Sequence, residues 1–439
     1  MNRFLIVLWS VLGTLILAAC NTSDTAQEES PETSASQAEE ATQSNKEEHE
    51  EDEHHDHEHA SSHARLAVSH ENGVWIIDSE GYEATESFDT KTSAIRLAAD
   101  DRHLFVSDRE SGSVKLLDSG VWSEAHGDHA HDYVEAPSLS TFELIGDEPT
   151  HFVNHGGYSA IFYDGSGEVQ VFDETAFTTE NELTPVTTIQ VAPHHGVAVP
   201  LPDGHVLASY TPEDNPQPLP EGVALFDAAG EEVERFAGCP GLHGEASGGS
   251  GDTETIAFGC EGQLLIYSVT EQEAIEIPLP DQNARVGTLK GLDNADYIVG
   301  NYSSEENPEL NTHISILDLN ERSVSTVDLG TEYVGSMAMD EEHAYVLGKD
   351  GEVYTVHLST VEIEGSISSI EPIAPSEGHG HGAPSPSMSL VEGNLYITDP
   401  AEMNLTLVDL AHQEVEVVKT FETPPTAVIA LKKGEAHDH

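Results

Sequence analysis

The chain has 439 residues, of which 81 are acidic and 16 are lysine or arginine, giving a formal net charge of −65. A field of this sign repels nucleic acids and anionic membrane surfaces and attracts cations, so we expect no nucleic-acid partner. The acidic residues are spread along the whole chain. This distribution is typical of a surface adapted to high salt or high pH, and it does not point to one acidic site.

The N-terminus predicts an exported lipoprotein. Arg3 precedes an apolar run that ends in Leu-Ala-Ala-Cys at residues 17–20. These are the parts of a signal peptide, here residues 1–19, and the cysteine after the small residues resembles the lipobox of bacterial lipoproteins. We therefore expect lipidation of Cys20 and an extracytoplasmic, membrane-anchored protein, at the cell surface of a bacterium with one membrane or at a periplasmic face. An ordinary secretory signal with an incidental cysteine is the alternative.

Residues 20–63 read as a Ser/Glu-rich disordered linker that ends in a histidine-rich tract. A tract of His, Asp and Glu with almost no apolar residues cannot form a core, and neutral imidazoles bind first-row transition metals. The tract predicts a flexible metal collector; a solvated acidic tail or a purification tag is the alternative. Its histidines are His49, His54, His55, His57, His59 and His63. Residues 434–439 form a short histidine-containing tail.

The body, residues 64–433, predicts an all-β fold. Pairs of short β-branched and aromatic runs, separated by glycine-containing turns, recur eight times at spacings of roughly 40 to 55 residues, which is typical of a β-propeller. We predict eight blades, or seven if one divergent repeat has been split in two. The run at 427–430 has no hairpin after it and the run at 67–68 has no inner strand before it. Pairing of these N- and C-terminal strands would close the ring.

Three successive repeats carry histidines at an equivalent place, just before a hairpin. If inner strands begin there, three imidazoles from neighbouring blades meet at one mouth of the central channel, an arrangement that suits tetrahedral zinc. Glu245 or Asn154 could accept a hydrogen bond that fixes an imidazole tautomer. Polar residues satisfied at strand starts are the alternative. The candidate metal-site residues are His151, His194, His195, His243 and Glu245.

Two loops carry further histidines, and two cysteines remain once Cys20 is assigned to the lipobox. The loops predict a second, more exposed metal site or a donor arm that closes over the first site, with solvated loops as the alternative. In an exported protein Cys239 and Cys260 are most simply a disulfide, and a cysteine-based metal site is the competing idea. We treat His343, His357 and the other isolated histidines as ordinary. The residues of the possible second site are His126, His129, His131, His379 and His381.

Several segments resemble those of AztD-type zinc metallochaperones: His-Phe-Val-Asn-His-Gly-Gly at 151–157, Ala-Pro-His-His-Gly at 192–196, Cys-Pro-Gly-Leu-His-Gly-Glu at 239–245 and the loop at 126–129. The resemblance spans about residues 63–433. It implies an exported β-propeller that acquires zinc and transfers it to the zinc-specific solute-binding protein of an ABC transporter. The lipobox and the acidity depart from that family and indicate a tethered version. We expect a monomer.

Two other classes of function stay open. Propellers also host lactonases, quinoprotein dehydrogenases and copper reductases, so the fold alone decides nothing. The sequence shows no nucleophile elbow, no catalytic Cys–His pair and no repeated Trp motif for a quinone, and none of the five methionines lies in a histidine cluster. We therefore expect no enzymatic activity. A passive surface metal buffer would need the histidine tracts but no ordered triad.

Overall fold

The computed structural model describes residues 64–126, 129–212, 219–373 and 384–431. Their regular structure is β-strand apart from three short 3-10 helices, η1 (Glu174–Ala176), η2 (Gly251–Thr253) and η3 (Pro308–Thr312). No helix in these ranges is long and apolar enough to cross a membrane. The signal segment, Cys20, the tract at 49–63, His379, His381 and the tail at 434–439 lie outside the described residues, so their assignments stay predictions.

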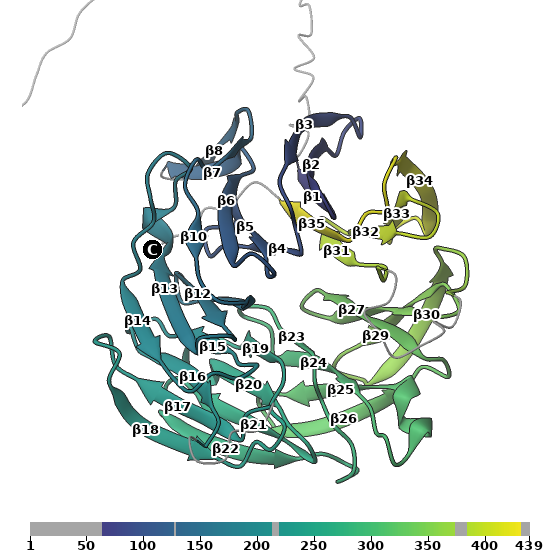
Figure 1. Cartoon of the computed structure of the whole chain (residues 1–439). Helices are drawn as coiled ribbons and strands as arrows, with labels where there is room; N and C mark the ends of the chain where they lie inside the picture. The colour runs from purple at the N-terminus through teal and green to yellow at the C-terminus, as the bar shows by residue number, and fades with distance from the viewer. Residues whose placement is uncertain (1–63, 127–128, 213–218, 374–383, 432–439) are drawn as a thin grey trace, which may run out of the picture. The chain divides into compact units, whose positions relative to one another are not determined.

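The strands form eight blades arranged in a ring (Figure 1). In each blade the strands are given from the inside outwards. The first blade consists of β35 (Ala427–Leu431), β1 (Arg65–His70), β2 (Gly73–Asp78) and β3 (Ala84–Asp89). The second blade consists of β4 (Ala94–Leu97), β5 (His103–Asp108), β6 (Ser113–Asp118) and two short strands that both pair with β6, namely β9 (Ser138–Leu139) and β10 (Leu144–Ile145). The third blade consists of β11 (Pro149–His155), β12 (Tyr158–Tyr163), β13 (Glu168–Asp173) and β14 (Thr187–Gln190), and the fourth of β15 (Ala198–Pro200), β16 (Val206–Tyr210), β17 (Gly222–Phe226) and β18 (Glu232–Ala237).

The other four blades continue in chain order, and one extra hairpin, β7 (Val121–His126) with β8 (His129–Val134), is inserted in the second blade. The fifth blade consists of β19 (Glu245–Gly248), β20 (Thr255–Gly259), β21 (Gln263–Ser268) and β22 (Glu273–Pro278), and the sixth of β23 (Leu289–Lys290), β24 (Tyr297–Tyr302), β25 (His313–Asp318) and β26 (Ser323–Asp328). The seventh blade consists of β27 (Tyr333–Met339), β28 (His343–Gly348), β29 (Glu352–His357) and β30 (Glu362–Ser368). The eighth consists of β31 (Met388–Val391), β32 (Asn394–Asp399), β33 (Asn404–Asp409) and β34 (Glu414–Thr420).

The ring closes through the first blade. β35, at the end of the described chain, pairs antiparallel with β1, in a register that runs from Arg65 opposite Leu431 to Ser69 opposite Ala427. Eight blades and closure by terminal strands are therefore confirmed, and the seven-blade alternative is wrong.

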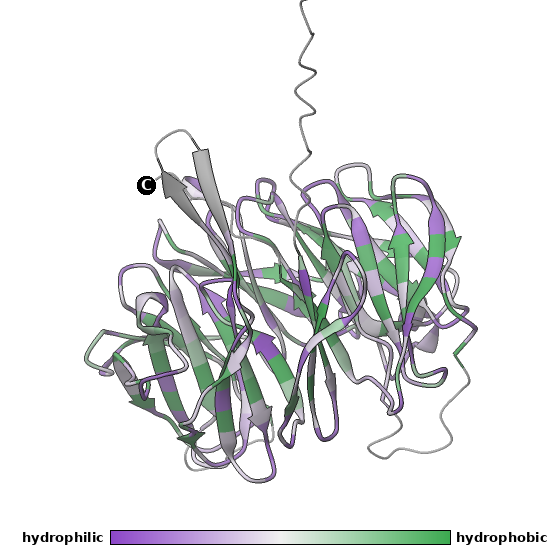
Figure 2. Ribbon diagram, turned by 90° about the horizontal axis from the view of Figure 1, so that it is seen from above, coloured by the Kyte–Doolittle hydropathy of each residue, from purple (hydrophilic) through white to green (hydrophobic). Residues whose placement is uncertain are grey.

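The burial of each strand follows its place in the blade. A blade packs between two neighbours, so its middle strands are covered on both faces and read as continuous apolar runs. All six residues of β5 are buried, whereas β3 and β18 are mostly exposed. Figure 2 shows the hydrophobic residues concentrated along the strands. The core clusters lie between adjacent blades, as where β12 and β13 pack against β15 and β16. This packing holds the inner strands, and the loops before them, in fixed positions.

Candidate metal centre

Three histidines from three neighbouring blades meet where the inner strands begin. His151 lies near the start of β11, His195 three residues before β15, and His243 two residues before β19. Their ring centroids are 5.0 Å apart for His151 and His195, 5.1 Å for His195 and His243, and 5.9 Å for His151 and His243. The blades therefore bring together residues that are far apart in the sequence, and we refer to these three residues as the histidine trio.

The trio presents its Nε2 atoms to one another. The Nε2 atom of His195 lies 3.5 Å from that of His151 and 3.2 Å from that of His243. One ligand atom from each residue can be chosen so that all three lie within 4.8 Å of one another. Two nitrogens bound to one tetrahedral zinc at the usual bond length lie about 3.3 Å apart. The spacing of the trio therefore fits a single zinc ion between the three rings.

The opposite nitrogen of each ring faces an acceptor. The Nδ1–H of His195 donates to Oδ2 of Asp164 at 2.7 Å, and that of His243 donates to the carbonyl oxygen of Gly287 at 2.5 Å. Neither acceptor can donate a proton, so each ring is protonated at Nδ1 and carries its lone pair on Nε2. The neutral rings of His195 and His243 therefore turn their Nε2 lone pairs toward each other across 3.2 Å and cannot hydrogen-bond to one another. A cation between them resolves this conflict, and a carboxylate or carbonyl behind each ring is the usual support of a metal-bound histidine.

The surroundings of His243 favour its neutral form. Burial lowers the pKa of His243, and any positive charge on its trio neighbours lowers it further. Only neutral imidazole binds a metal, so a lowered pKa reduces the competition from protons near neutral pH.

Asp164 is the supporting residue that the sequence analysis missed. It is 7% exposed and follows β12 in an Asp-Gly turn, which reads as turn chemistry alone. Its carboxylate accepts hydrogen bonds from His195, from Arg109 at 3.1 Å and from the backbone N–H of Gly196 at 3.3 Å. Burial on its own would raise the pKa of Asp164, but the hydrogen bond from His195, with further bonds from Thr150 and Arg109, holds this pKa below its ordinary value. The carboxylate therefore stays charged behind His195.

Glu245 lies beside the trio, on the side away from the Nε2 atoms. Its Oε2 atom is 3.6 Å from Nδ1 of His151 and is buried without a hydrogen-bond partner in the described part of the chain. This position suits a residue that orients His151, and the carboxylate is not part of the group of converging ligand atoms. The trio and Glu245 line a cavity of about 470 Å³ to which Arg96 also contributes. A metal held by the trio would therefore keep a fourth position open to water or to an incoming ligand.

His194 does not join the trio, although it is adjacent to His195. Its ring is buried, with Nδ1 donating to the carbonyl oxygen of Ala192 at 2.7 Å and Nε2 2.8 Å from Oγ of Ser209. Both nitrogens are engaged, so the structure places His194 as a satisfied core histidine. Asn154 likewise bonds elsewhere, to the carbonyl of Leu97. The side chains of residues 124–132, and with them His126, His129 and His131, lie outside the described part of the structure.

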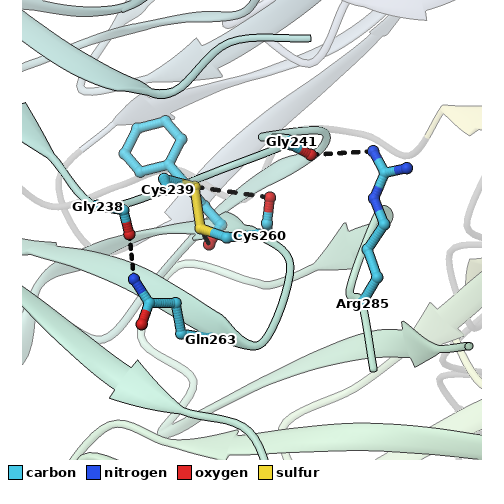
Figure 3. The surroundings of a disulfide bond; sticks show 8 residues. Gly238, Cys239, Gly241, Cys260, Gln263 and Arg285 are labelled. Atoms are coloured by element: carbon cyan, nitrogen blue, oxygen red, sulfur yellow. Dashed lines mark hydrogen bonds between the residues drawn. A yellow bond between two sulfur atoms is a disulfide. The ribbon is translucent and has the colours of Figure 1, made fainter. Parts of the chain in front are cut away.

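The loop that carries His243 is held by a disulfide. Cys239 and Cys260 are bonded, as predicted (Figure 3). Both are fully buried. The side chain of Gln263 donates to the carbonyl of Gly238, and Arg285 donates to the carbonyl of Gly241 at 3.0 Å (Figure 3). The backbone N–H of His243 then donates to the carbonyl of Gly259 at 3.0 Å. These contacts fix the loop against β20 immediately before the ligand.

No family model matches the chain, but a sequence comparison and a structure comparison both find the same protein. The zinc chaperone AztD of Citrobacter koseri is 31% identical over 353 residues, which cover 76% of this chain and 79% of that protein. A crystal structure of C. koseri AztD has a TM-score of 0.75 at 28% identity, covering 86% of this chain and 100% of that one. The structure of apo AztD from the same organism has a TM-score of 0.72 at 27% identity, covering 85% and 99%. The dihydro-heme d1 dehydrogenase NirN has a TM-score of 0.52 at 12% identity, covering 84% and 74%, which shows a shared fold alone.

Proposed function

The chain belongs to the AztD zinc-chaperone family, and on this basis we propose that it holds a zinc ion at His151, His195 and His243 and transfers it to the solute-binding protein of a zinc ABC transporter. The observation that carries the proposal is the convergence of three Nε2 atoms whose rings are backed by Asp164 and by the carbonyl of Gly287. The donor set of three imidazoles is one that zinc prefers, and zinc is the cargo.

The geometry also supports handover. Three protein ligands leave one coordination position free, and the site lines an open cavity. A ligand of a docked acceptor can enter this position before the first imidazole leaves. Zinc would then pass from protein to protein without entering solution. A site closed by four protein ligands has no such free position.

We further propose how zinc reaches the site. The histidine tract at residues 49–63 supplies many weak sites, which exchange metal faster than an ordered trio. Lipidation at Cys20 would hold this collector, the propeller and the transporter on one extracytoplasmic membrane surface and raise their effective concentration. The protein acts in this proposal as a carrier without enzymatic activity.

A transfer assay tests the proposal. The full chain is loaded with one equivalent of zinc, and the rate of transfer to the cognate solute-binding protein is compared with the rate of release to a chelator of similar affinity. We expect transfer that accelerates with acceptor concentration and exceeds chelator-limited release. Equal rates would mean that zinc simply dissociates, and the protein would then be a buffer.

Two variants sharpen the assay. Replacing one trio ligand, as in His243→Asn, should weaken zinc binding by about a hundredfold or more and abolish the slow, tight phase. His205→Asn is the matched control, because His205 lies outside the cavity lining and pairs with Asp203. Replacing the six tract histidines by serine should slow loading and leave one tight site.

A further inference from the structure

A second group of metal-ligand side chains lies on the seventh blade. His343 is the first residue of β28, His357 is the last residue of β29, and Glu364 lies in β30. One ligand atom from each can be chosen so that all lie within 4.8 Å of one another, and among the described residues only the trio forms another such group. In the sequence both histidines stand alone and read as ordinary.

The two histidines face each other across adjacent strands. His343 is directly opposite His357, and the backbone N–H of Leu358 donates to the carbonyl of Glu342. This hydrogen bond flanks the histidines and makes them a non-hydrogen-bonded pair, the type in which opposite side chains lie closest. Their ring centroids are 5.2 Å apart. The strand pairing therefore holds both imidazoles on one face of the blade.

A β-bulge brings the carboxylate to this pair. Val356 pairs with Ile363 and Thr355 pairs with Gly365, so Glu364 is the extra residue of the bulge. A bulge leaves its extra residue unpaired and redirects its side chain. Oε2 of Glu364 lies 3.3 Å from Nε2 of His343. The side chain thus approaches from β30, the outermost strand of the blade, toward the nitrogen that a metal would use.

The other nitrogen of each ring has its own partner. Nδ1 of His343 lies 3.3 Å from Oδ1 of Asp340, and Nδ1 of His357 lies 3.3 Å from Oγ of Ser359. Asp340 is itself fixed by the hydroxyl of Tyr345 at 2.8 Å and by the backbone N–H of His343 at 2.7 Å. As in the trio, Nδ1 of each ring faces a polar partner, which leaves Nε2 to bind a metal.

We propose that His343, His357 and Glu364 form a second, peripheral binding site for zinc or a similar divalent transition metal. Two imidazoles and one carboxylate suit zinc, copper(II) or nickel(II) and do not suit calcium or magnesium. The site is independent of the proposed function: it lies on the three outer strands of its blade, beyond the end of inner strand β27, whereas the trio lies where inner strands begin. Half of the Glu364 side chain is exposed, so metal enters and leaves more readily here than at the trio. Bound metal also joins β28, β29 and β30.

Residue-resolved histidine labelling tests this site in the full chain. The protein is treated with diethyl pyrocarbonate at increasing zinc chloride, and acylation of each histidine is measured by peptide mass spectrometry. We expect zinc to protect His343 and His357 with one shared midpoint. His412, on the eighth blade, is the matched control. It pairs with Asp409 of the same blade and belongs to neither metal-ligand group among the described residues. Equal labelling of His343 and His357 with and without zinc would overturn the proposal.

Substitutions distinguish protection by a bound metal from a general effect of zinc on histidine acylation. Glu364→Gln should raise the zinc midpoint at His343 and His357 by at least about tenfold, and Glu352→Gln, at the other end of β29, should not. His343→Asn should remove the protection of His357. An equal effect of both glutamate variants would contradict the site. Labelling of His151, His195 and His243 in the same samples reports separately on the trio, so the two proposals can fail independently.

Discussion

Replacing Asp164 by Asn tests the reasoning about the trio most directly, because it changes a charge behind one ring and leaves every proposed ligand in place. Asp164 accepts the Nδ1–H of His195 at 2.7 Å and is buried. The amide introduced by Asp164→Asn could still accept this bond through its oxygen, but without charge. In the flipped orientation the NH₂ of the amide would donate to Nδ1 and put the ring proton on Nε2, where the metal must bind.

The size of the effect follows from these contacts. Loss of a carboxylate behind a metal-bound histidine costs about 10- to 100-fold in affinity, or about 1.4 to 2.7 kcal/mol. The fold should change little, about 1 kcal/mol, because Arg109 keeps its ion pair with Glu148 at 2.8 Å. The pKa of Asp164 is held below its ordinary value, so its contribution is complete above the ordinary range of a carboxyl and is lost as pH falls through the lowered pKa. The ratio of wild-type to variant affinity should therefore be constant between about pH 6 and 8.

The assay is zinc competition against a chromophoric chelator, with thermal unfolding of the zinc-free protein measured in parallel. Glu148→Gln is the matched control, since Glu148 shares Arg109 but does not contact His195. We expect this control to bind zinc like the wild type. Unchanged zinc affinity in a folded Asp164→Asn variant would refute the role of the carboxylate. A loss as large as that caused by removing His195 would mean that the introduced amide donates to Nδ1 and holds the ring proton on Nε2.

Two further predictions concern stability. Burial lowers the pKa values of His194 and His243, so the folded protein resists their protonation and the zinc-free protein should lose stability as pH falls below about 6.5. The melting temperature, measured from pH 8 to 5, should fall less steeply in His194→Asn than in the wild type. An unchanged dependence of the melting temperature on pH would contradict this cause. Replacing both Cys239 and Cys260 by Ala should lower the free energy of unfolding by about 3 kcal/mol and weaken zinc binding through the His243 loop, as measured by denaturant titration and chelator competition. Full zinc affinity in a folded double variant would mean that Gln263 and Arg285 suffice to hold the loop.

The sequence by itself determined the architecture and the proposed ligands. Each repeat carries its own strand pattern and turn residues, so eight hairpins and the unpaired terminal runs at 67–68 and 427–430 were readable without any long-range contact. His151, His195 and His243 recur at one position of a repeat, and repeats of a propeller place equivalent positions around one axis. The same periodicity did not separate His194 from His195. Which of two adjacent side chains faces the channel depends on the local backbone turn.

Only the tertiary structure decided what surrounds those ligands. Asp164 and the carbonyl of Gly287 reach the trio from turns and loops whose sequence signals describe a turn and nothing more. The group of His343, His357 and Glu364 depends on the pairing register of two strands and on one bulge that redirects a glutamate. Register and bulge position arise from packing between strands and blades, and a shift of one residue would turn each side chain to the opposite face. For this reason a repeat pattern can predict a ring of histidines but cannot predict the atoms that stand behind them.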